Sequence, residues 1–240
     1  MIDLHCHILP GLDDGAGDLD DAVDMALQAE GDGIRTICAT PHIRHDHDVR
    51  IPELSGRVAR LNAELSDRSI GVRIAVGGEV AETALGGLDA TELARVALAG
   101  KRWILLEPAP GPLSESLIGA ADHLSEHGFR ALIAHPERHL GAEATEVLAR
   151  LARKGALIQG TAALLEPEGS ALLDLGRRGL LHVLGSDAHS ARIGRPVRLA
   201  AGFEALSRLP ELQPHIRWIA ELAPAAILAG EDVAPPFPPH

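Results

Sequence analysis

Tyrosine is absent from this 240-residue sequence, and all aromatic residues together make up 2 % of it. The core must therefore be aliphatic, which a hydrophobic content of 46 % permits. The length suffices for one sizeable core, so the simplest prediction is a single domain over 1–232. The proline-rich end, 233–240, is predicted to be an extended or disordered tail.

Cysteine and basic residues are also scarce. Cys6 and Cys38 lie in apolar runs, which argues against a disulfide framework and favours a reducing cytoplasm. With 22 basic against 34 acidic residues the net charge is −12, which disfavours a broad surface for nucleic acid or anionic membranes. The chain has neither a leader-like start nor an apolar window of ~20 residues. We therefore predict a cytoplasmic protein that binds no nucleic acid and does not insert into membranes.

Short strand-like runs alternate with amphipathic stretches along most of the chain. The strand candidates are "MIDLHCH", "IRTICATPH", "VRIAVGGEV", "RWILLEP", "RALIAHPER", "ALIQGTA" and "LHVLGSDAH". Helices are predicted over 18–32, 53–67, 89–99, 113–127, 143–154, 171–178, 197–208 and 211–229, several ending near a glycine such as Gly33 or Gly71. This alternation predicts an α/β fold with a parallel sheet, either closed as a barrel or open and doubly wound. The first strand is followed by no GxGxxG or Walker loop, which disfavours a nucleotide-binding Rossmann fold.

The first strand contains His5 and His7 on either side of a cysteine. Because side chains alternate along a strand, the two imidazoles are expected on one face and Leu4 and Cys6 on the other. Such a pair is as compatible with metal ligation as with a structural role.

Polar residues also interrupt the later strands, each at a carboxyl end. They are His42, Glu79, Glu107, His135, Gln159, Asp187 and His189, and the turn after the first strand adds Asp13 and Asp14. In a parallel barrel all these ends open onto the face where active sites lie. Such a set indicates a polynuclear metal site, and the opening pair supplies its first two ligands.

Imidazole and carboxylate donors without thiolates suit Mn²⁺, Fe²⁺ or Zn²⁺. The donors exceed what one ion needs, so two or three ions with bridging carboxylates are predicted, and Glu107 is the best-placed bridge. Clustered ions activate water and hold the oxygens of a phosphoryl group, which predicts hydrolysis.

These motifs resemble the polymerase and histidinol phosphatase (PHP) superfamily of metal-dependent phosphoesterases. "DLHCH", "ATPH", "GGEV", "LLE", "AHPER" and "GSDAH" occur in order over roughly 1–200. "MIDLHCHILPGLDDGAGD", "HPER" and "SDAH…GRP" are similar, more narrowly, to bacterial tyrosine phosphatases encoded with capsule and exopolysaccharide genes.

The resemblance implies a distorted (β/α)7 barrel with three metal ions, usually manganese. It assigns one ion to His5, His7, Glu107 and Asp187, a second to His42, Glu107 and His135, and a third to Asp14, Glu79 and His189. Arg138 and Arg195 would bind phosphate or stabilise the transition state, which suits the bidentate fork of a guanidinium. His42 or His189 would protonate the leaving group only if not fully committed to a metal, and a bound water is the equal alternative.

The resemblance also bears on the substrate. It implies phosphotyrosine on a polysaccharide-assembly tyrosine kinase, with histidinol phosphate or another small phosphomonoester as the alternative. Two segments depart from the narrower family: "HIRHDHDVRIPEL", which lacks the expected aromatic residue and glycine, and "QGTAALLEPEGS", where Gln159 receives no role.

Three rival hypotheses are weaker on the residues present. Arg44 follows Cys38 at the Cys-x5-Arg spacing of cysteine-dependent phosphatases, but Pro41 removes an amide donor and an apolar strand disfavours a thiolate. An amidohydrolase with a metal-bridging lysine lacks a candidate, because Lys101 and Lys154 do not end strands. A metal-dependent binding protein without catalysis would be expected to lack some of the ligands.

Overall fold

The structure, a computed structural model, describes residues 1–165 and 170–239. Its strands are β1 (Ile2–Cys6), β2 (Thr36–Ala39), β3 (His42–Ile43), β4 (Arg73–Val76), β5 (Glu79–Ala81), β6 (Trp103–Glu107), β7 (Arg130–Ile133), β8 (Leu157–Thr161) and β9 (Val183–Gly185). Its helices are α1 (Leu19–Asp32), α2 (Leu54–Asp67), α3 (Ala90–Val96), α4 (Glu115–Glu126), α5 (Ala144–Arg153), α6 (Ala171–Arg177), α7 (Ala200–Ser207) and α8 (Ala223–Ala229).

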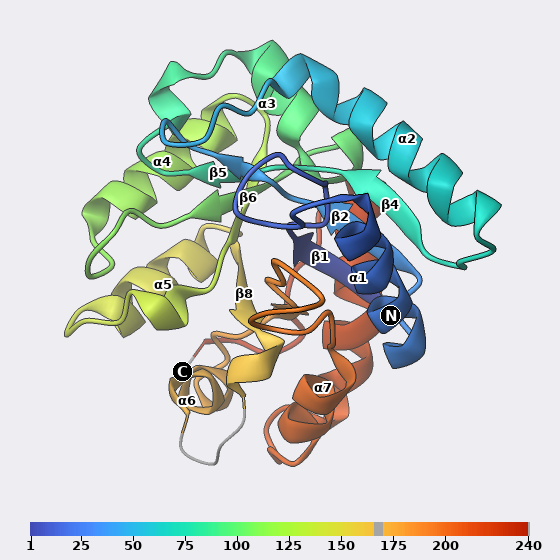
Figure 1. Cartoon of the computed structure of the whole chain (residues 1–240). Helices are drawn as coiled ribbons and strands as arrows, with labels where there is room; N and C mark the ends of the chain where they lie inside the picture. The colour runs from blue at the N-terminus through green and yellow to red at the C-terminus, as the bar shows by residue number, and fades with distance from the viewer. Residues whose placement is uncertain (166–169, 240) are drawn as a thin grey trace.

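All the strand pairs are parallel, as the alternation predicted. One sheet has the order β1-β2-β4 and the other β3-β5-β6-β7-β8-β9. A bridge between Cys6 and Ala188 joins β1 to the segment after β9, so the sheets curl around a common interior. Helices α1 to α7 surround this curled sheet (Figure 1). The fold is therefore α/β with the helices outside a parallel sheet.

Most helices begin and end close to their predicted positions. In α1 the Asp18 side chain accepts a hydrogen bond from Asp21 N, and the helix ends at Gly33, whose φ is 85°. After α2 the left-handed residue is Ser69 rather than the predicted Gly71. No helix in the described part of the chain is long and apolar enough to cross a membrane.

The stretch predicted as a helix near 211–229 is helical from Gln213 to Ala229, but it is not one uniform α-helix. This stretch consists of a short turn at Gln213–His215, a π-helical segment at Trp218–Leu222 and then α8. Pro224 lies in the first turn of α8, and proline has no N–H to continue a preceding α-helix. The proline therefore lies where the π-helical segment gives way to α8, and the chain stays helical across it.

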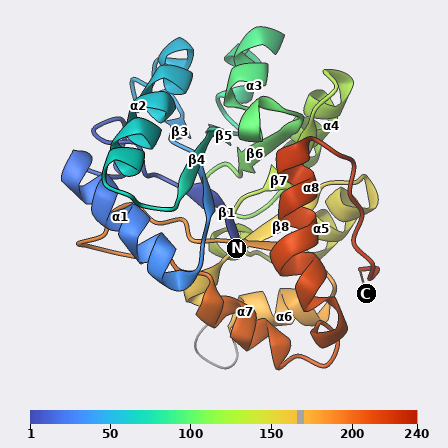
Figure 2. The same cartoon turned by 90° about the vertical axis from the view of Figure 1, so that its right-hand side faces the viewer.

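An apolar cluster fills the interior of the curled sheet. It contains Leu4, Cys38, Leu98, Trp103, Leu105, Leu132, Ala134, Leu157 and Val183, together with Ala223 and Ile227 of α8. Figure 2 shows α8, in red, beside the strands, with the carboxyl terminus next to it. Trp103, the first residue of β6, donates a hydrogen bond to Glu231 O at 2.9 Å, just past α8. Helix α8 therefore closes the end where the strands begin and leaves their carboxyl ends open.

The first strand does not alternate as predicted. Leu4 belongs to the interior cluster, whereas Cys6 packs in the larger cluster that includes the helices. The pairing of β1 with β2 shifts register between Asp3 and Cys6. Such a bulge re-aims side chains, so His5 and His7 continue the inward face that Leu4 begins. The expectation that Leu4 and Cys6 share a face is thus corrected.

The described part of the proline-rich tail, 233–239, has no helix or strand but packs against the rest of the chain. Phe237 is buried, with its ring 5.0 Å from His215, 5.6 Å from Trp218 and 5.9 Å from His182 between centroids. Immediately before the tail, Asp232 accepts a hydrogen bond from Arg130 at 2.9 Å. The tail therefore packs against the same end of the sheet as α8.

His182, next to this tail, provides a prediction on stability. It is fully buried, accepts from Ile158 N and contacts Gly179 O, and burial lowers its pKa from 6.5 to about 4. Below pH 6.5 the unfolded chain binds a proton at this imidazole, whereas the folded chain does not until the pH nears 4. The free energy of unfolding therefore falls as the pH falls toward 4. Between pH 6.5 and 5 we expect a loss of ~2 kcal/mol from this group. His182→Gln should flatten that part of the pH profile in urea unfolding, and an unchanged profile would contradict the prediction.

Candidate metal centre

His5 lies in β1 and His7 lies immediately after it, and their side chains point toward the same place. Both side chains are fully buried, and their Nε2 atoms lie 3.3 Å apart. Each Nδ1 atom is engaged on the far side of its ring: His5 with Gln159 Oε1 at 2.9 Å and His7 with Asp13 Oδ2 at 2.8 Å. Both Nε2 atoms are therefore directed into the site.

Glu79, the first residue of β5, lies at the centre of the histidines. Its Oε1 is 2.8 Å from His135 Nε2 and 3.3 Å from His5 Nε2. Its Oε2 is 3.0 Å from His42 Nδ1 and 3.3 Å from His7 Nε2. Burial alone would raise the pKa of this carboxyl, but His5 and hydrogen bonds with neighbouring imidazoles hold the pKa well below its ordinary value. Glu79 is thus a buried carboxylate in contact with four imidazoles.

Two glycines bring Glu79 to this position. The break at Gly77 and Gly78 separates β4 from β5, and β5 then pairs with β3 so that His42 lies opposite Glu79. A Cβ on Gly78 would lie 2.9 Å from a side-chain carbon of Ile43 and 3.0 Å from Val96 Cβ. Because Gly77 and Gly78 have no side chains, the chain between β4 and β5 can pack closely against Ile43 and Val96.

The open side of the site is formed by Asp14 and His189. Asp14 Oδ1 lies 3.4 Å from His42 Nε2 and 3.5 Å from His189 Nε2. The Asp14 side chain is 59 % exposed, so this part of the site contacts solvent. Burial lowers the pKa of His189 to about 4, helped by the nearby imidazole of His7, which keeps His189 neutral at pH 7. A neutral imidazole is the form that binds metals.

Two predicted ligands have an uncommon backbone conformation. His135 and Asp187 have φ values of 25° and 50°, a region that residues other than glycine seldom occupy. Each lies two residues after the end of a strand, His135 after β7 and Asp187 after β9, and Asp187 N donates to His5 O at 2.9 Å. Strain of this kind concentrates at functional sites, where the surrounding structure holds it in place.

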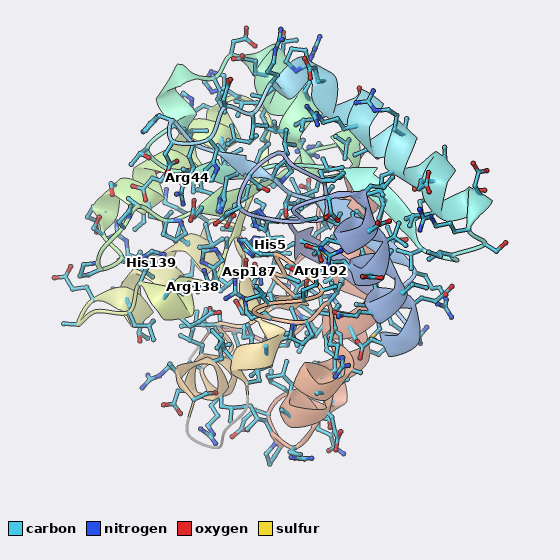
Figure 3. All side chains as sticks on the ribbon, viewed as in Figure 1. His5, Arg44, Arg138, His139, Asp187 and Arg192 are labelled. Carbon is cyan, nitrogen blue, oxygen red and sulfur yellow. The ribbon has the colours of Figure 1, made fainter. Side chains whose placement is uncertain are left out.

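Three arginines border the centre. Arg138 donates to Asp187 Oδ2, and Arg195 Nη2 lies 3.0 Å from the same oxygen while its Nε donates to Asp187 O. Arg44 Nη1 donates to Glu107 Oε1 at 3.4 Å. Figure 3 shows His5 and Asp187 near the middle of this face, with Arg44 and Arg138 beside them. Arg138 and Arg195 are both partly exposed, so their remaining N–H groups can reach a bound anion.

The nine predicted ligands come together in four overlapping groups whose donor atoms lie within 4.8 Å of one another. These groups are His7, Asp14, His42 and His189; His5, His7 and Asp187; His5, Glu79 and His135; and His42, Glu79 and Glu107. The grouping differs from the one the resemblance implied. Glu107 lies with His42 and Glu79, and the carboxylate between the histidines is Glu79. The resemblance placed Glu79 with Asp14 and His189. In the structure that group contains His7 and His42 in place of Glu79.

The chemistry of these residues fits divalent cations. His42 Nδ1 and Glu79 Oε2 are 3.0 Å apart, yet among the described residues neither atom has a hydrogen-bond partner of acceptable geometry. Buried polar atoms without partners are costly, and a cation between them would satisfy both. A donor set of five imidazoles and four carboxylates, with no cysteine among them, suits Mn²⁺, Fe²⁺ or Zn²⁺.

Asp13 was predicted to reach the site together with Asp14, but its role as the partner of His7 was missed. Its carboxylate binds His7 Nδ1, and it also accepts from His42 N at 2.9 Å and Gly15 N at 3.0 Å. Burial would raise the pKa of Asp13, but the contact with His7 lowers it to about 2. A Cβ on Gly15 would collide with His7 O, so only glycine fits this turn. The sequence "DDG", in which a glycine follows two aspartates, was the feature of the chain that could have indicated this turn.

Asp21 was also missed, because an acidic residue in an amphipathic helix usually faces solvent. Here it is buried at the start of α1. Its Oδ1 accepts from Ser190 Oγ at 3.1 Å and Ala191 N at 2.9 Å, and its Oδ2 accepts from Gly17 N at 3.2 Å. Asp21 therefore joins the loop that carries Asp14 to the loop that carries His189.

The structure argues against the rival chemistries. Cys38 is fully buried in the interior cluster, where burial raises its pKa to about 12. Arg44 pairs with Asp46 at 2.6 Å rather than forming a loop with Cys38. Lys101 precedes β6 and packs beside Gly230, whereas Lys154 precedes β8 and pairs with Asp122. Both lysines thus lie at the end of the sheet opposite the candidate centre.

Comparison with known sequences identifies relatives over most of the chain. The family model for capsular polysaccharide synthesis, CpsB/CapC, matches residues 1–212. The tyrosine-protein phosphatase YwqE of Bacillus subtilis is 34 % identical over 199 residues, which cover 80 % of this chain and 78 % of YwqE. The putative tyrosine-protein phosphatase CapC of Staphylococcus aureus is 29 % identical over 201 residues, covering 79 % and 77 %.

Comparison with solved structures agrees. A chain from the crystal structures of YwqE from Bacillus subtilis and CpsB from Streptococcus pneumoniae, described as metal-dependent tyrosine phosphatases, matches with a TM-score of 0.82. The two chains are 26 % identical and covered to 100 % and 99 %. Histidinol phosphate phosphatase from Lactococcus lactis, at 16 % identity and a TM-score of 0.57 over 91 % and 94 %, shares the fold. On the sequence match over residues 1–212, this chain belongs to the CpsB/CapC family.

Proposed function

We propose that this protein is a metal-dependent protein-tyrosine phosphatase that acts in capsule or exopolysaccharide regulation. One observation carries the proposal: nine imidazole and carboxylate side chains, from several strands and the loops that follow them, converge beside two partly exposed arginines. Membership of the CpsB/CapC family supports the same activity, since YwqE and CpsB are described as metal-dependent tyrosine phosphatases. The substrate proposed is phosphotyrosine on a polysaccharide-assembly tyrosine kinase.

We propose that two or three divalent ions, Mn²⁺ by preference, occupy the four residue groups. His5, His7 and Asp187 would hold one, His135 and Glu107, each grouped with Glu79, would contribute to a second, and Asp14, His42 and His189 would hold a third. Glu79, in contact with four of these imidazoles, is the carboxylate we propose as the bridge. When bound, such ions supply an activated water and offset charge on the phosphoryl oxygens.

The chain's own residues bind and orient the substrate. Arg138 and Arg195 are partly exposed, and their N–H groups that do not contact Asp187 can bind phosphoryl oxygens. A planar guanidinium presents such donors in a fixed geometry. His189, neutral at pH 7, suits a ligand better than a proton donor. The leaving group is a phenolate, whose conjugate acid has a pKa of about 10, so it departs with less need of protonation than an alkoxide.

We also propose that the fold is a distorted barrel of seven β/α units. On this view β2 with β3, and β4 with β5, each form one strand broken at Pro41 or at Gly77 and Gly78. The parallel pairings of β2 with β4 and of β3 with β5 support this count, as does the bridge from Cys6 to Ala188. The two free buried cysteines suit the cytoplasm, where we place the protein.

The test compares two substrates on one preparation. Metal-free protein is loaded with Mn²⁺ and assayed on a phosphotyrosyl peptide and on histidinol phosphate. We expect hydrolysis of the peptide, its loss with chelator, and its return with Mn²⁺. Preference for histidinol phosphate would instead make the protein a small-molecule phosphatase, and activity that resists metal removal would overturn the metal-dependent mechanism.

Cys38→Ser separates this mechanism from cysteine-based catalysis. Because the thiol is buried with its pKa near 12, we expect kcat to change by less than about twofold in the folded variant. Circular dichroism would check the fold, since a hydroxyl in an apolar cluster lowers stability. Loss of activity in a folded, Mn²⁺-loaded variant would indicate a thiolate nucleophile.

A further inference from the structure

Gln159 is a buried polar side chain to which the proposed chemistry gives no role. It lies on β8 with no exposed surface, two residues after Leu157 of the interior cluster. Its Oε1 is 2.9 Å from His5 Nδ1, and its Nε2 donates to Gly160 O at 2.7 Å. Side chains 154 residues apart in sequence therefore meet at the first histidine of the centre.

The contact with Gly160 determines which end of the amide faces His5. The carbonyl of Gly160 only accepts, so the amide NH₂ of Gln159 must point to it and the amide oxygen must point to His5. That oxygen cannot donate. His5 must then carry its proton on Nδ1, which leaves the Nε2 lone pair free on the side where Glu79 and His7 lie.

The neighbouring strand is shaped to allow this contact. Gly185 ends β9, which lies between β8 and β1. A Cβ at Gly185 would lie 2.8 Å from Gln159 Nε2 and 2.8 Å from His5 Cβ. Even an alanine at position 185 would therefore collide with both residues. The contact between Gln159 and His5 thus requires the absence of a side chain at Gly185.

We propose that Gln159 is a positioning residue that holds His5 in the Nδ1–H tautomer, with Nε2 presented as a metal ligand. The inference rests on the proposed metal-dependent function. It parallels the arrangement at His7, where Asp13 binds Nδ1 from the opposite side. Partners of this kind fix the tautomer and ring orientation of metal-binding histidines, and their loss lowers metal affinity about 10- to 100-fold.

Metal binding to the protein tests the proposal without an activity assay. Metal-free wild type, Gln159→Leu and Gln159→Glu are titrated with Mn²⁺ by calorimetry. Leucine removes the acceptor and should weaken binding about 10- to 100-fold, whereas glutamate retains an acceptor oxygen and should restore most of the affinity. Gln213→Leu, in an exposed turn remote from the site, is the matched control and should bind as wild type does.

The tautomer itself is measured on the wild-type protein, so the test does not depend on a variant that folds. Long-range ¹H–¹⁵N spectra of the Zn²⁺-loaded protein should show His5 Nδ1 protonated and Nε2 bound. A proton on Nε2, or equal Mn²⁺ affinity in Gln159→Leu, would overturn the inference and leave the proposed function standing. Wild-type protein that binds neither Mn²⁺ nor Zn²⁺ would overturn both.

Discussion

Glu79→Gln is expected to lower kcat/KM on a phosphotyrosyl peptide by at least about 10³-fold, equivalent to ~4 kcal/mol of transition-state stabilisation. The physical reason is the position of this carboxylate, fully buried and within 3.3 Å of four imidazoles. Glutamine has nearly the same shape but no charge, and its NH₂ group cannot bind a cation. The measurements are steady-state kinetics with Mn²⁺ and the metal-to-protein ratio by elemental analysis.

The same experiment distinguishes Glu79 from the bridge expected on sequence grounds. Glu107→Gln should reduce metal content and rate less, because Glu107 groups only with His42 and Glu79. Glu64→Gln, on the exposed face of α2 beside Arg68, is the control and should leave both unchanged. If Glu107→Gln proves the more damaging substitution, the central role assigned to Glu79 is wrong.

Arg138→Ala and Arg195→Ala should each lower kcat/KM by about 10²- to 10³-fold, the usual effect of removing one donor to transition-state charge. The two guanidinium groups converge on Asp187 and remain partly exposed. A phosphoryl group carries charge on three oxygens as it transfers, so fixed N–H donors stabilise it without reorganising. Arg138→Lys should recover only part of the loss, because an ammonium lacks the planar fork.

Metal content separates this effect from damage to the centre. Both alanine variants should retain the wild-type Mn²⁺ stoichiometry, since neither arginine supplies a metal donor atom. Arg208→Ala removes an exposed arginine that pairs with Glu204, and its activity should be normal. A double variant, Arg138→Ala with Arg195→Ala, that stays within threefold of wild type would refute the phosphate-binding role.

Local patterns were sufficient to predict the strands and the residues at their ends. The period of apolar residues, interrupted by polar ones, located strands such as β6 and β8 to within one or two residues. Parallel connection then required the carboxyl ends to meet, and the structure brings His135 within 2.8 Å of Glu79. Neither inference needed the position of any distant residue.

Local patterns failed where the outcome depends on a neighbouring strand. The bulge in β1 arises from its pairing with β2, and it reverses the face of Cys6 relative to Leu4. The step at Gly77 and Gly78 likewise depends on the match with β3, and it makes Glu79 the central carboxylate. Glu79 and Glu107 look equivalent along the chain because both mark a strand end.

The order of polar and apolar residues thus determined that this protein is an α/β fold with donors gathered on one face, because side-chain period and parallel connection are properties of the chain itself. The tertiary structure alone decided which donors touch, how Gln159 reaches His5, and that Phe237 packs against His182. Those contacts depend on strand register and on space left by glycines, which are set only when distant segments pack.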